Sequence, residues 1–332
     1  MQLGASLRFA QPSAQPSGQP SGPSVGADAR IRESEWEALR PRRQAENFLE
    51  AARAIRDADL DLLLVGDRHA IPVNAFSPVP LIARLMAETG QVPIGCLFLA
   101  PFYNPVLLAE QIGTIAAFAP GPFTAAFAVG DTEAQFAAFN MALKSRTVRT
   151  DEVVECVRRL LDGESVTFEG RYHRLQGVRT GPLPESSVRI WIGGRRGAAV
   201  ERAGRLGDAW ISDTGASDDE LVAEMTRYRA AAALHGRPTK AVLRRSIFVG
   251  ETDADADSFV HHVLAGASRG LTPERVLHGS ASRVVEDLNR YAEMGFDLTI
   301  VRHLAGGHGA MLESMARIGE QVMPALREAG KS

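Results

Sequence analysis

The sequence has few cysteines and no long apolar segment. Its 332 residues contain two cysteines, Cys96 and Cys156, which are too few for a disulfide framework. Cys96 lies in an apolar run and Cys156 in a helical pattern, so we expect both to be buried core residues. No run of about 18 apolar residues indicates a membrane span, and Met1–Ala10 lacks the apolar stretch of a signal peptide. We therefore expect a protein of a reducing, cytoplasmic compartment.

The sequence also lacks a large excess of charge of either sign. Lys and Arg number 37 against 40 Asp and Glu, and no block of one sign occurs. Because nucleic acids and anionic membranes attract basic stretches, we expect neither as a partner. We assign no metal ligands. The 45% hydrophobic content is that of an ordinary globular protein with enough apolar material for a core.

One segment, residues 11–24, is of low complexity. Its repeated part reads QPSAQPSGQPSG. Proline removes hydrogen-bond donors, glycine adds chain entropy, and nothing in the repeat favours burial, so we expect a flexible loop. The loop is either a lid over a binding site or a tolerated insertion, and its composition does not distinguish the two.

Short apolar runs alternate with helical patterns along the chain. Runs that are apolar throughout are typical of parallel strands buried on both faces. We predict eight such strands: Gln2–Phe9, Leu60–Val65, Val92–Leu99, Phe123–Val129, Val188–Ile192, Ala209–Ser212, Ala241–Val249 and Leu298–Val301. No glycine-rich dinucleotide fingerprint follows the first strand, which disfavours an open doubly wound sheet. The pattern predicts an α/β fold, a closed parallel (β/α)8 TIM barrel with insertions, formed by residues 1–332 as a single domain.

Helical patterns follow most of these strands, and one stretch interrupts the alternation. The expected helices are Glu33–Asp57, Val79–Glu88, Val106–Phe118, most of Thr132–Leu161, Ala198–Leu206, Asp218–Leu234, Ala254–Ala265, Ala281–Met294 and Ala310–Arg327. Residues 164–184 break the pattern. Within them, Thr167–Phe168 and Tyr172–Arg174 indicate a small hairpin insertion.

Barrels of this kind carry their reacting groups at the carboxyl ends of the strands. His69 follows the second predicted strand and is the best candidate for proton transfer, with Asp67 placed to orient it. A lone loop histidine is more often a surface or capping residue, so that alternative stays open. Gly130 follows the fourth strand and is a further candidate in a cofactor-binding loop.

The sequence GGRRG, Gly193 to Gly197, lies between a predicted strand and a helix. Backbone amides at a helix start bind anions, glycines allow a phosphate to approach, and Arg195 and Arg196 offer bidentate forks. We interpret it as a phosphate cradle for a flavin mononucleotide or similar cofactor. A glycine-rich turn with two solvated arginines is the alternative.

Further residues are candidates for contact with the cofactor, in the case of Asn104, or for the substrate pocket, in the case of Phe102, Tyr103, Arg302 and His303. Tyr103 and Asn104 either face a planar ring system or are turn residues before a proline. His303 follows the last strand, where it can project inward, and Arg302 beside it either does the same or forms a structural ion pair. Apolar residues including Phe76 and Phe102 favour an apolar mouth and a weakly charged organic substrate.

Six stretches together resemble the bacterial-luciferase-like monooxygenase superfamily. In order they are LLLVGDRHA, FLAPFYNPVLLAEQIGTIA, RTDEVVECVRRLLDGESVTFEGRYHRLQGV, IWIGG followed by AGRLGDAW, DLTIVRH, and IGEQVMPAL. The resemblance runs from about Leu60 to the C-terminus. It implies a barrel, usually a homodimer, that binds reduced FMN or a deazaflavin at the C-terminal mouth. It also implies cofactor contacts for Ala100, Pro101 and Asn104, and places His69 near the flavin.

The sequence departs from the family pattern around the fourth strand. The usual arginines are missing there, and Asp131 places negative charge beside Gly130. Three hypotheses follow. The first is a monooxygenase that receives reduced FMN from a separate reductase and oxygenates a small organic substrate with O2. The second is a deazaflavin-dependent oxidoreductase that transfers a hydride, and the third is a non-catalytic partner subunit.

Overall fold

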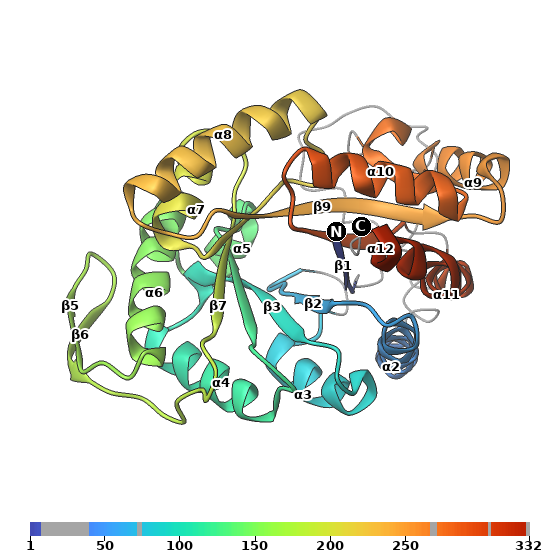
Figure 1. The fold of residues 1–332 in the computed structure, drawn as a ribbon. Helices are drawn as coiled ribbons and strands as arrows, with labels where there is room; N and C mark the ends of the chain where they lie inside the picture. The colour runs from blue at the N-terminus through green and yellow to red at the C-terminus, as the bar shows by residue number, and fades with distance from the viewer. Residues whose placement is uncertain (8–39, 72–74, 266–270, 305–306, 330–332) are drawn as a thin grey trace, which may run out of the picture.

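Eight parallel strands close into a barrel that helices surround (Figure 1). The computed structural model describes residues 1–7, 40–71, 75–265, 271–304 and 307–329, so the predicted loop 11–24 lies outside the described residues. In order around the barrel, the strands are β1 (Gln2–Ser6), β2 (Leu62–Gly66), β3 (Ile94–Leu99), β4 (Thr124–Ala128), β7 (Arg189–Gly193), β8 (Ala209–Ile211), β9 (Lys240–Val249) and β11 (Leu298–His303). Pairing of β11 with β1 completes the ring and confirms the predicted barrel.

Alternate residues of each strand face either the barrel interior or the surrounding helices. The interior cluster consists of Leu62, Leu64, Ala126, Trp191, Ala209, Ile211, Val242, Leu298 and Ile300. The neighbours Leu63, Val65 and Val301 belong instead to the larger cluster between barrel and helices. Because side chains alternate along a strand, Arg244 and Arg302, each two residues beyond an interior residue, also face inward.

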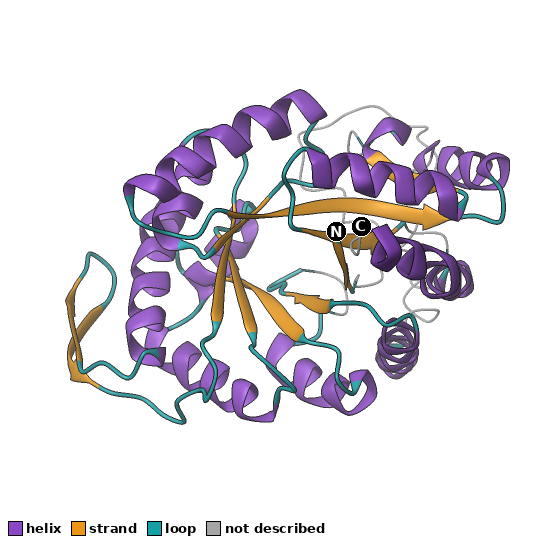
Figure 2. Ribbon diagram, in the orientation of Figure 1, coloured by secondary structure: helices purple, strands orange, loops and turns teal. Residues whose placement is uncertain are grey.

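The helices that cover the barrel are shown in purple in Figure 2. Their bounds are α2 (Pro41–Asp57), α3 (Pro78–Thr89), α4 (Pro105–Phe118), α5 (Glu133–Ala138), α6 (Arg146–Leu161), α7 (Ala198–Leu206), α8 (Asp218–Leu234), α9 (Asp253–Ala265), α10 (Ala281–Glu293), α11 (His308–Arg317) and α12 (Met323–Ala329). Proline occupies the first turn of α2, α3 and α4, where its missing N–H costs nothing. Ser217 and Glu220 form a capping box at the start of α8.

Two elements differ from the sequence prediction. A short strand missing from it, β10 (Val276–Gly279), pairs with the C-terminal half of β9 outside the eight-stranded ring. The expected helix over Thr132–Leu161 is interrupted between α5 and α6 by the 3-10 turn η2 (Leu143–Ser145). Asn140 between α5 and η2 has a φ of +54°, a left-handed conformation that ends a helix and that asparagine tolerates better than most residues.

Strands β5 (Val166–Glu169) and β6 (Arg174–Val178) form an antiparallel hairpin beside α6, at the left of Figure 1. The carboxylate of Glu152, on α6, accepts hydrogen bonds from the backbone amides of Arg171, Tyr172 and His173 at 2.6, 3.0 and 2.9 Å. These bonds attach the turn of the hairpin to the helix.

Three aspartates hold the amino-terminal ends of the strands in register. Asp61, Asp208 and Asp297 each directly precede a strand and accept a hydrogen bond from an amide near the start of a neighbouring strand. The donors are the amides of Leu3, Ile190 and Ala241, at 2.8, 2.7 and 2.8 Å respectively. A slip of one residue would exchange the interior and exterior faces, so these contacts stabilise the register.

Within the described residues, none of the helices has the length and hydrophobicity needed to cross a bilayer. The same part of the chain contains no group of three His, Cys, Asp or Glu side chains arranged to hold a metal ion.

Candidate functional site at the carboxyl-terminal mouth of the barrel

All eight barrel strands run parallel, so their carboxyl ends meet at one opening, the mouth. Most of the residues singled out in the sequence lie in the loops that follow β2, β3, β4 and β7 and therefore surround this mouth. The local contacts decide which of them are available to a ligand.

The buried carboxylate of Asp67 organises the loop that follows β2. Its Oδ2 accepts hydrogen bonds from Nε2 of His69 (3.1 Å), the hydroxyl of Tyr103 (3.0 Å) and the backbone amide of Leu99 (3.0 Å). Its Oδ1 is buried without a hydrogen-bond partner among the described residues. Because Nε2 of His69 donates, Nδ1 is the basic nitrogen of the neutral ring. The predicted pairing of Asp67 with His69 is present.

The ring of His69 lies among aromatic side chains. Its centroid is 5.3 Å from that of Phe102, 5.6 Å from Tyr103 and 5.6 Å from Phe139, each in an edge-on arrangement. Phe102 also packs against Phe136 at 4.8 Å. These contacts hold the imidazole in one orientation while 23% of the His69 side chain stays exposed.

Burial raises the pKa of the Tyr103 phenol, and the negative charge of Asp67 raises it further. The same two causes raise the pKa of the Cys96 thiol. Tyr103 therefore stays protonated and donates to Asp67, and Cys96 is an inert core residue. Tyr103 orients the Asp67–His69 pair through its hydroxyl.

The segment after β3 forms the short 3-10 helix η1 (Ala100–Phe102) and then starts α4. Ala100 and Pro101 are buried within η1. The side chain of Asn104 caps α4, because its Oδ1 accepts the amides of Val106 at 2.9 Å and Leu107 at 3.4 Å. Because Oδ1 is used for this cap, its hydrogen bonds favour the interpretation of Asn104 as a turn residue over that of a residue in contact with a cofactor ring.

Gly130 lies in the loop two residues after β4 and has a φ of +70°, a left-handed conformation that favours glycine. A Cβ at this position would lie 3.2 Å from the Phe136 ring and 3.5 Å from the Phe102 ring. Gly130 therefore allows the aromatic rings beside His69 to pack against the β4 loop.

The loop from Gly193 to Gly197 connects β7 to α7, as predicted. Its Gly194 amide donates to the Ile211 carbonyl (3.2 Å), and its carbonyl accepts from Trp210 Nε1 (2.9 Å). A Cβ at Gly194 would lie 2.5 Å from the carbonyl oxygen of Ala199, so only glycine fits. At Gly197, with a φ of +48°, a Cβ would meet nothing within 4 Å.

The two arginines of this loop face acidic side chains. Arg196 donates to Glu220 at 2.5 Å, and Arg195 lies 3.6 Å from the same carboxylate and 3.8 Å from Asp213. The Arg196 hydrogen bond lowers the pKa of Glu220 to about 2. Glu220 and Asp213 therefore offset part of the charge of the two arginines, whose side chains remain 42% and 70% exposed.

His303 and Arg302 have opposite orientations on β11. His303 is buried on the helix side, where Nε2 lies 3.1 Å from the hydroxyl of Ser314 on α11. Burial lowers the pKa of His303 to about 4, so the ring is neutral. His303 does not line the mouth, because the strand alternation turns it outward, whereas Arg302 faces inward.

Sequence reasoning missed one inward-facing residue, Arg244 in the middle of β9. Burial lowers the pKa of its guanidinium, and the nearby charge of Arg68 lowers it further, whereas Asp213 raises it. The sequence does carry a signal for Arg244, which is a charged residue in the middle of a long and mostly apolar strand. The predicted apolar mouth is present only in part, because Phe76 packs against Phe48 in the outer core.

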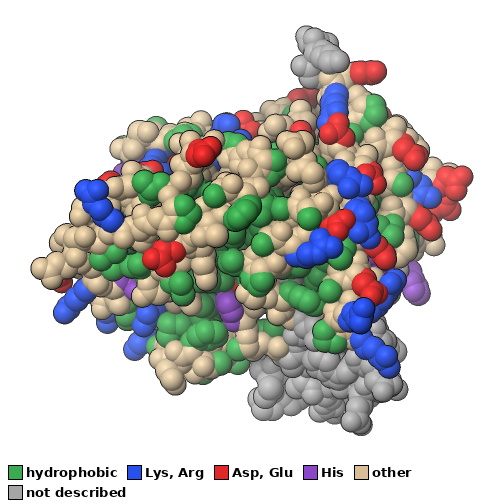
Figure 3. All heavy atoms as spheres, turned by 90° about the horizontal axis from the view of Figure 1, so that it is seen from below, with side chains coloured by type: hydrophobic (Ala, Val, Ile, Leu, Met, Phe, Trp, Pro, Cys, Tyr) green, Lys and Arg blue, Asp and Glu red, His purple; other side chains and the backbone are tan. Residues whose placement is uncertain are grey.

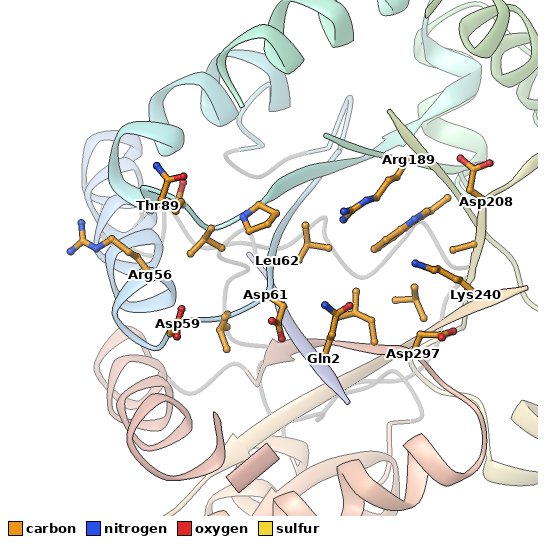
Figure 4. A pocket seen from close by; sticks show the side chains of 18 of the residues that line it. Gln2, Arg56, Asp59, Asp61, Leu62, Thr89, Arg189, Asp208, Lys240 and Asp297 are labelled. Carbon is orange, nitrogen blue, oxygen red and sulfur yellow. The ribbon is translucent and has the colours of Figure 1, made fainter. Parts of the chain in front are cut away.

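A cavity of about 620 Å³ lies at the opposite, amino-terminal end of the barrel. Arg189 and Lys240 point into it (Figure 4). Asp208 and Asp297, also on its wall, are two of the aspartates that hold the strand ends. The two aspartates at this end therefore have structural partners, and the catalytic candidates His69 and Asp67 lie at the mouth.

A model of the luciferase-like monooxygenase family matches residues 26–323. The chain belongs to this family. Members of the family are flavin- or deazaflavin-dependent oxidoreductases and monooxygenases, so the chain is an enzyme of this class. The resemblance seen in the sequence is confirmed.

Individual relatives fall into both groups. An F420-dependent glucose-6-phosphate dehydrogenase of Nakamurella multipartita is 27% identical over 288 residues, which cover 76% of this chain and 83% of that protein. The structure of monooxygenase RslO1 from Streptomyces bottropensis has a TM-score of 0.79 at 20% identity, over 98% of this chain and 99% of that one. EDTA monooxygenase from Chelativorans sp. BNC1 has a TM-score of 0.77 at 18% identity, over 99% and 94%.

Proposed function

We propose that this enzyme transfers a hydride between a small organic substrate and a deazaflavin cofactor bound at the mouth. This is the second of the three activities that the sequence raised. The observation that carries it is the Asp67–His69 pair, which leaves a basic ring nitrogen at the mouth. The dehydrogenase of Nakamurella multipartita, named as F420-dependent, supports the choice of cofactor.

The loop after β7 fits a cofactor phosphate through its backbone. The amides of Gly197 and Ala198 at the start of α7 donate to no described residue, and the space in front of Gly197 is open. A helix start of this kind favours an anion. Ala100 and Pro101 would support the ring of the cofactor, as the family resemblance implies. A deazaflavin bound there supplies an acceptor for two electrons and one hydrogen.

His69 then acts as the proton acceptor. When a substrate carbon loses hydride from an alcohol, the hydroxyl proton must leave as well, and Nδ1 of His69 takes it. Asp67 holds Nε2–H and stabilises the positive charge that forms on the ring. Phe102 and Phe139 restrict water around the ring, which strengthens both interactions.

The test compares anaerobic binding of a deazaflavin and of reduced FMN, followed by fluorescence. We expect the deazaflavin to bind more tightly, and turnover to proceed without O2. His69→Gln should retain binding and lower kcat by about 100-fold or more, because a general base contributes about that much. His261→Gln, an exposed histidine on α9, is the matched control and should keep full activity.

Tighter binding of reduced FMN with O2-dependent turnover would establish the second candidate, a monooxygenase supplied by a separate reductase. The partly exposed Phe139 ring beside His69 favours this candidate, because it gives the mouth an apolar face for an organic substrate. Binding of neither cofactor would favour a non-catalytic partner subunit.

We also infer a homodimer that forms through the face covered by α3 and α4. Figure 3 shows that hydrophobic side chains gather on this face of the molecule. Leu107 and Phe118, both on α4, are 52% and 75% exposed. Exposed apolar side chains of this size are unusual on a monomer when they cluster. Analytical ultracentrifugation of the chain and of Phe118→Ser tests the assignment.

A further inference from the structure

We propose that Arg68 and Arg244 form an oxyanion-binding site inside the mouth, which holds a carboxylate or phosphate-type group of the substrate. The inference rests on the proposed function in that it places the substrate beside His69. It adds a substrate class, an anionic organic molecule, in place of the weakly charged substrate that the sequence favoured.

Arg244 has the position of a ligand-binding residue. It follows the interior residue Val242 by two positions on β9, so its side chain faces the barrel interior, and the charged groups that act on it, Asp213 and Arg68, both belong to loops at the mouth. Its backbone amide donates to the Ser212 hydroxyl at 3.1 Å, which fixes the strand at this point. Its guanidinium has no hydrogen bond or ion pair to any described residue, although an arginine presents five donors.

Arg68 supplies the second cation from the loop after β2. It lies between Asp67 and His69 in sequence and is half-buried. Among the described residues its side chain has no ion-pair partner. Its charge disfavours the protonated form of Arg244, so the two guanidinium groups lie close enough to repel each other. Such a pair is stabilised by an anion between them.

The acidic groups near this pair are already engaged. Asp213, the carboxylate that raises the pKa of Arg244, is partly exposed and lies 3.8 Å from Arg195. Its Oδ1 also accepts the Gly215 amide at 2.9 Å. Glu220 pairs with Arg196. Asp213 therefore offsets only part of the positive charge of Arg68 and Arg244, because it acts on Arg195 as well as on Arg244.

The arrangement also explains how a substrate would be oriented. Arg68 is adjacent in sequence to both members of the Asp67–His69 pair, and the short loop after β2 carries all three residues. An anionic group held by Arg68 and Arg244 would keep the rest of the substrate near the imidazole, which lowers the entropic cost of the reaction.

Binding of inorganic phosphate to the purified full chain tests the site directly. Isothermal titration calorimetry at constant ionic strength, with chloride as the balancing ion, measures its Kd. We expect Arg244→Gln to weaken phosphate binding by about tenfold or more. Arg68→Gln should do the same, and Arg244→Lys should lose less because it keeps the charge. Arg179→Gln removes an exposed charge near the hairpin and is the matched control.

An unchanged Kd in folded Arg244→Gln and Arg68→Gln, or no phosphate binding by the wild-type chain, would overturn the proposal. The same titration with the cofactor present separates two sources of the anion. If saturating cofactor abolishes phosphate binding, the pair holds the phosphate of the cofactor and the substrate assignment is wrong. If the chain binds phosphate through Arg244 but binds no deazaflavin, the site stands and the proposed function fails.

Discussion

His69 and His303 both lie near the carboxyl end of a barrel strand, but the backbone places their rings in different surroundings. His69 lies in a loop and is partly exposed, and its ring is hydrogen-bonded to the carboxylate of Asp67. His303 lies on the outer face of β11, buried against the Ser314 hydroxyl. Both are histidines near the end of a barrel strand, so the sequence alone does not separate the catalytic candidate His69 from the core residue His303, which lies on the strand and on its outer face.

The burial of His303 predicts an acid-sensitive fold. The ring stays neutral in the folded chain, with a pKa of about 4, whereas the unfolded chain takes up a proton below the ordinary pKa of 6.5. The titration of His303 therefore does not change the stability above about pH 6.5. Between about pH 6.5 and 4, the free energy of unfolding falls as the pH decreases. The total loss is about 3 kcal/mol.

Urea unfolding at several pH values between 7.5 and 4.5 measures this loss. In His303→Gln the slope of stability against pH should be smaller by up to about 1.4 kcal/mol per pH unit. The exposed variant His261→Gln should keep the wild-type slope. An identical slope in all three proteins would show that His303 does not titrate differently on folding.

At the scale of elements, the connection between β7 and α7 depends on one close approach. A Cβ at Gly194 would lie 2.5 Å from the Ala199 carbonyl oxygen, whereas a Cβ at Gly193 would meet its nearest atom, the Phe127 carbonyl oxygen, at 3.5 Å. We expect Gly194→Ala to lower the free energy of unfolding by about 1–3 kcal/mol, because the start of α7 must shift. Gly193→Ala should cost less than about 1 kcal/mol.

Urea unfolding of the two variants, with cofactor binding measured on the same samples, checks this expectation. Since the two substitutions add the same methyl group one residue apart, a similar loss of stability in both would contradict the packing argument.

Elements with a strong local signal could be predicted, and those set by tertiary contacts could not. The eight barrel strands are apolar on both faces and stand out from the sequence. Strand β10 is short and forms because it pairs with β9. The break between α5 and α6 depends on the left-handed Asn140, and many asparagines lie in uninterrupted helices.

The same distinction holds for the site. The Asp67–His69 pair was predicted because its members lie two residues apart in one loop. The ion pairs of Arg195 and Arg196 with Glu220 were not, because Glu220 belongs to α8 and reaches the loop only through the fold. Arg244 was not predicted as a site residue because its role depends on whether its side chain faces the interior of the barrel or the surrounding helices.

At the scale of the whole molecule, the first and last strands of the described barrel lie side by side. Gln2 pairs with Leu298 and Ala5 with Val301, so β1 lies between β11 and β2 rather than at an edge. We expect the amides of β1 to be among the slowest to exchange with deuterium, although terminal strands commonly fray. Native-state hydrogen exchange measures this, and exchange of the Ala5 amide at a free energy well below that of global unfolding would contradict it.

The position of β11 also has a consequence for biosynthesis. It is made after the other seven barrel strands, yet it fills the gap between β9 and β1. While the chain is still on the ribosome, both of those strands keep an unpaired edge, and unpaired edges favour association between chains. Closure of the barrel therefore waits until the ribosome has made β11. A newly made chain has to be kept apart from its copies during that interval.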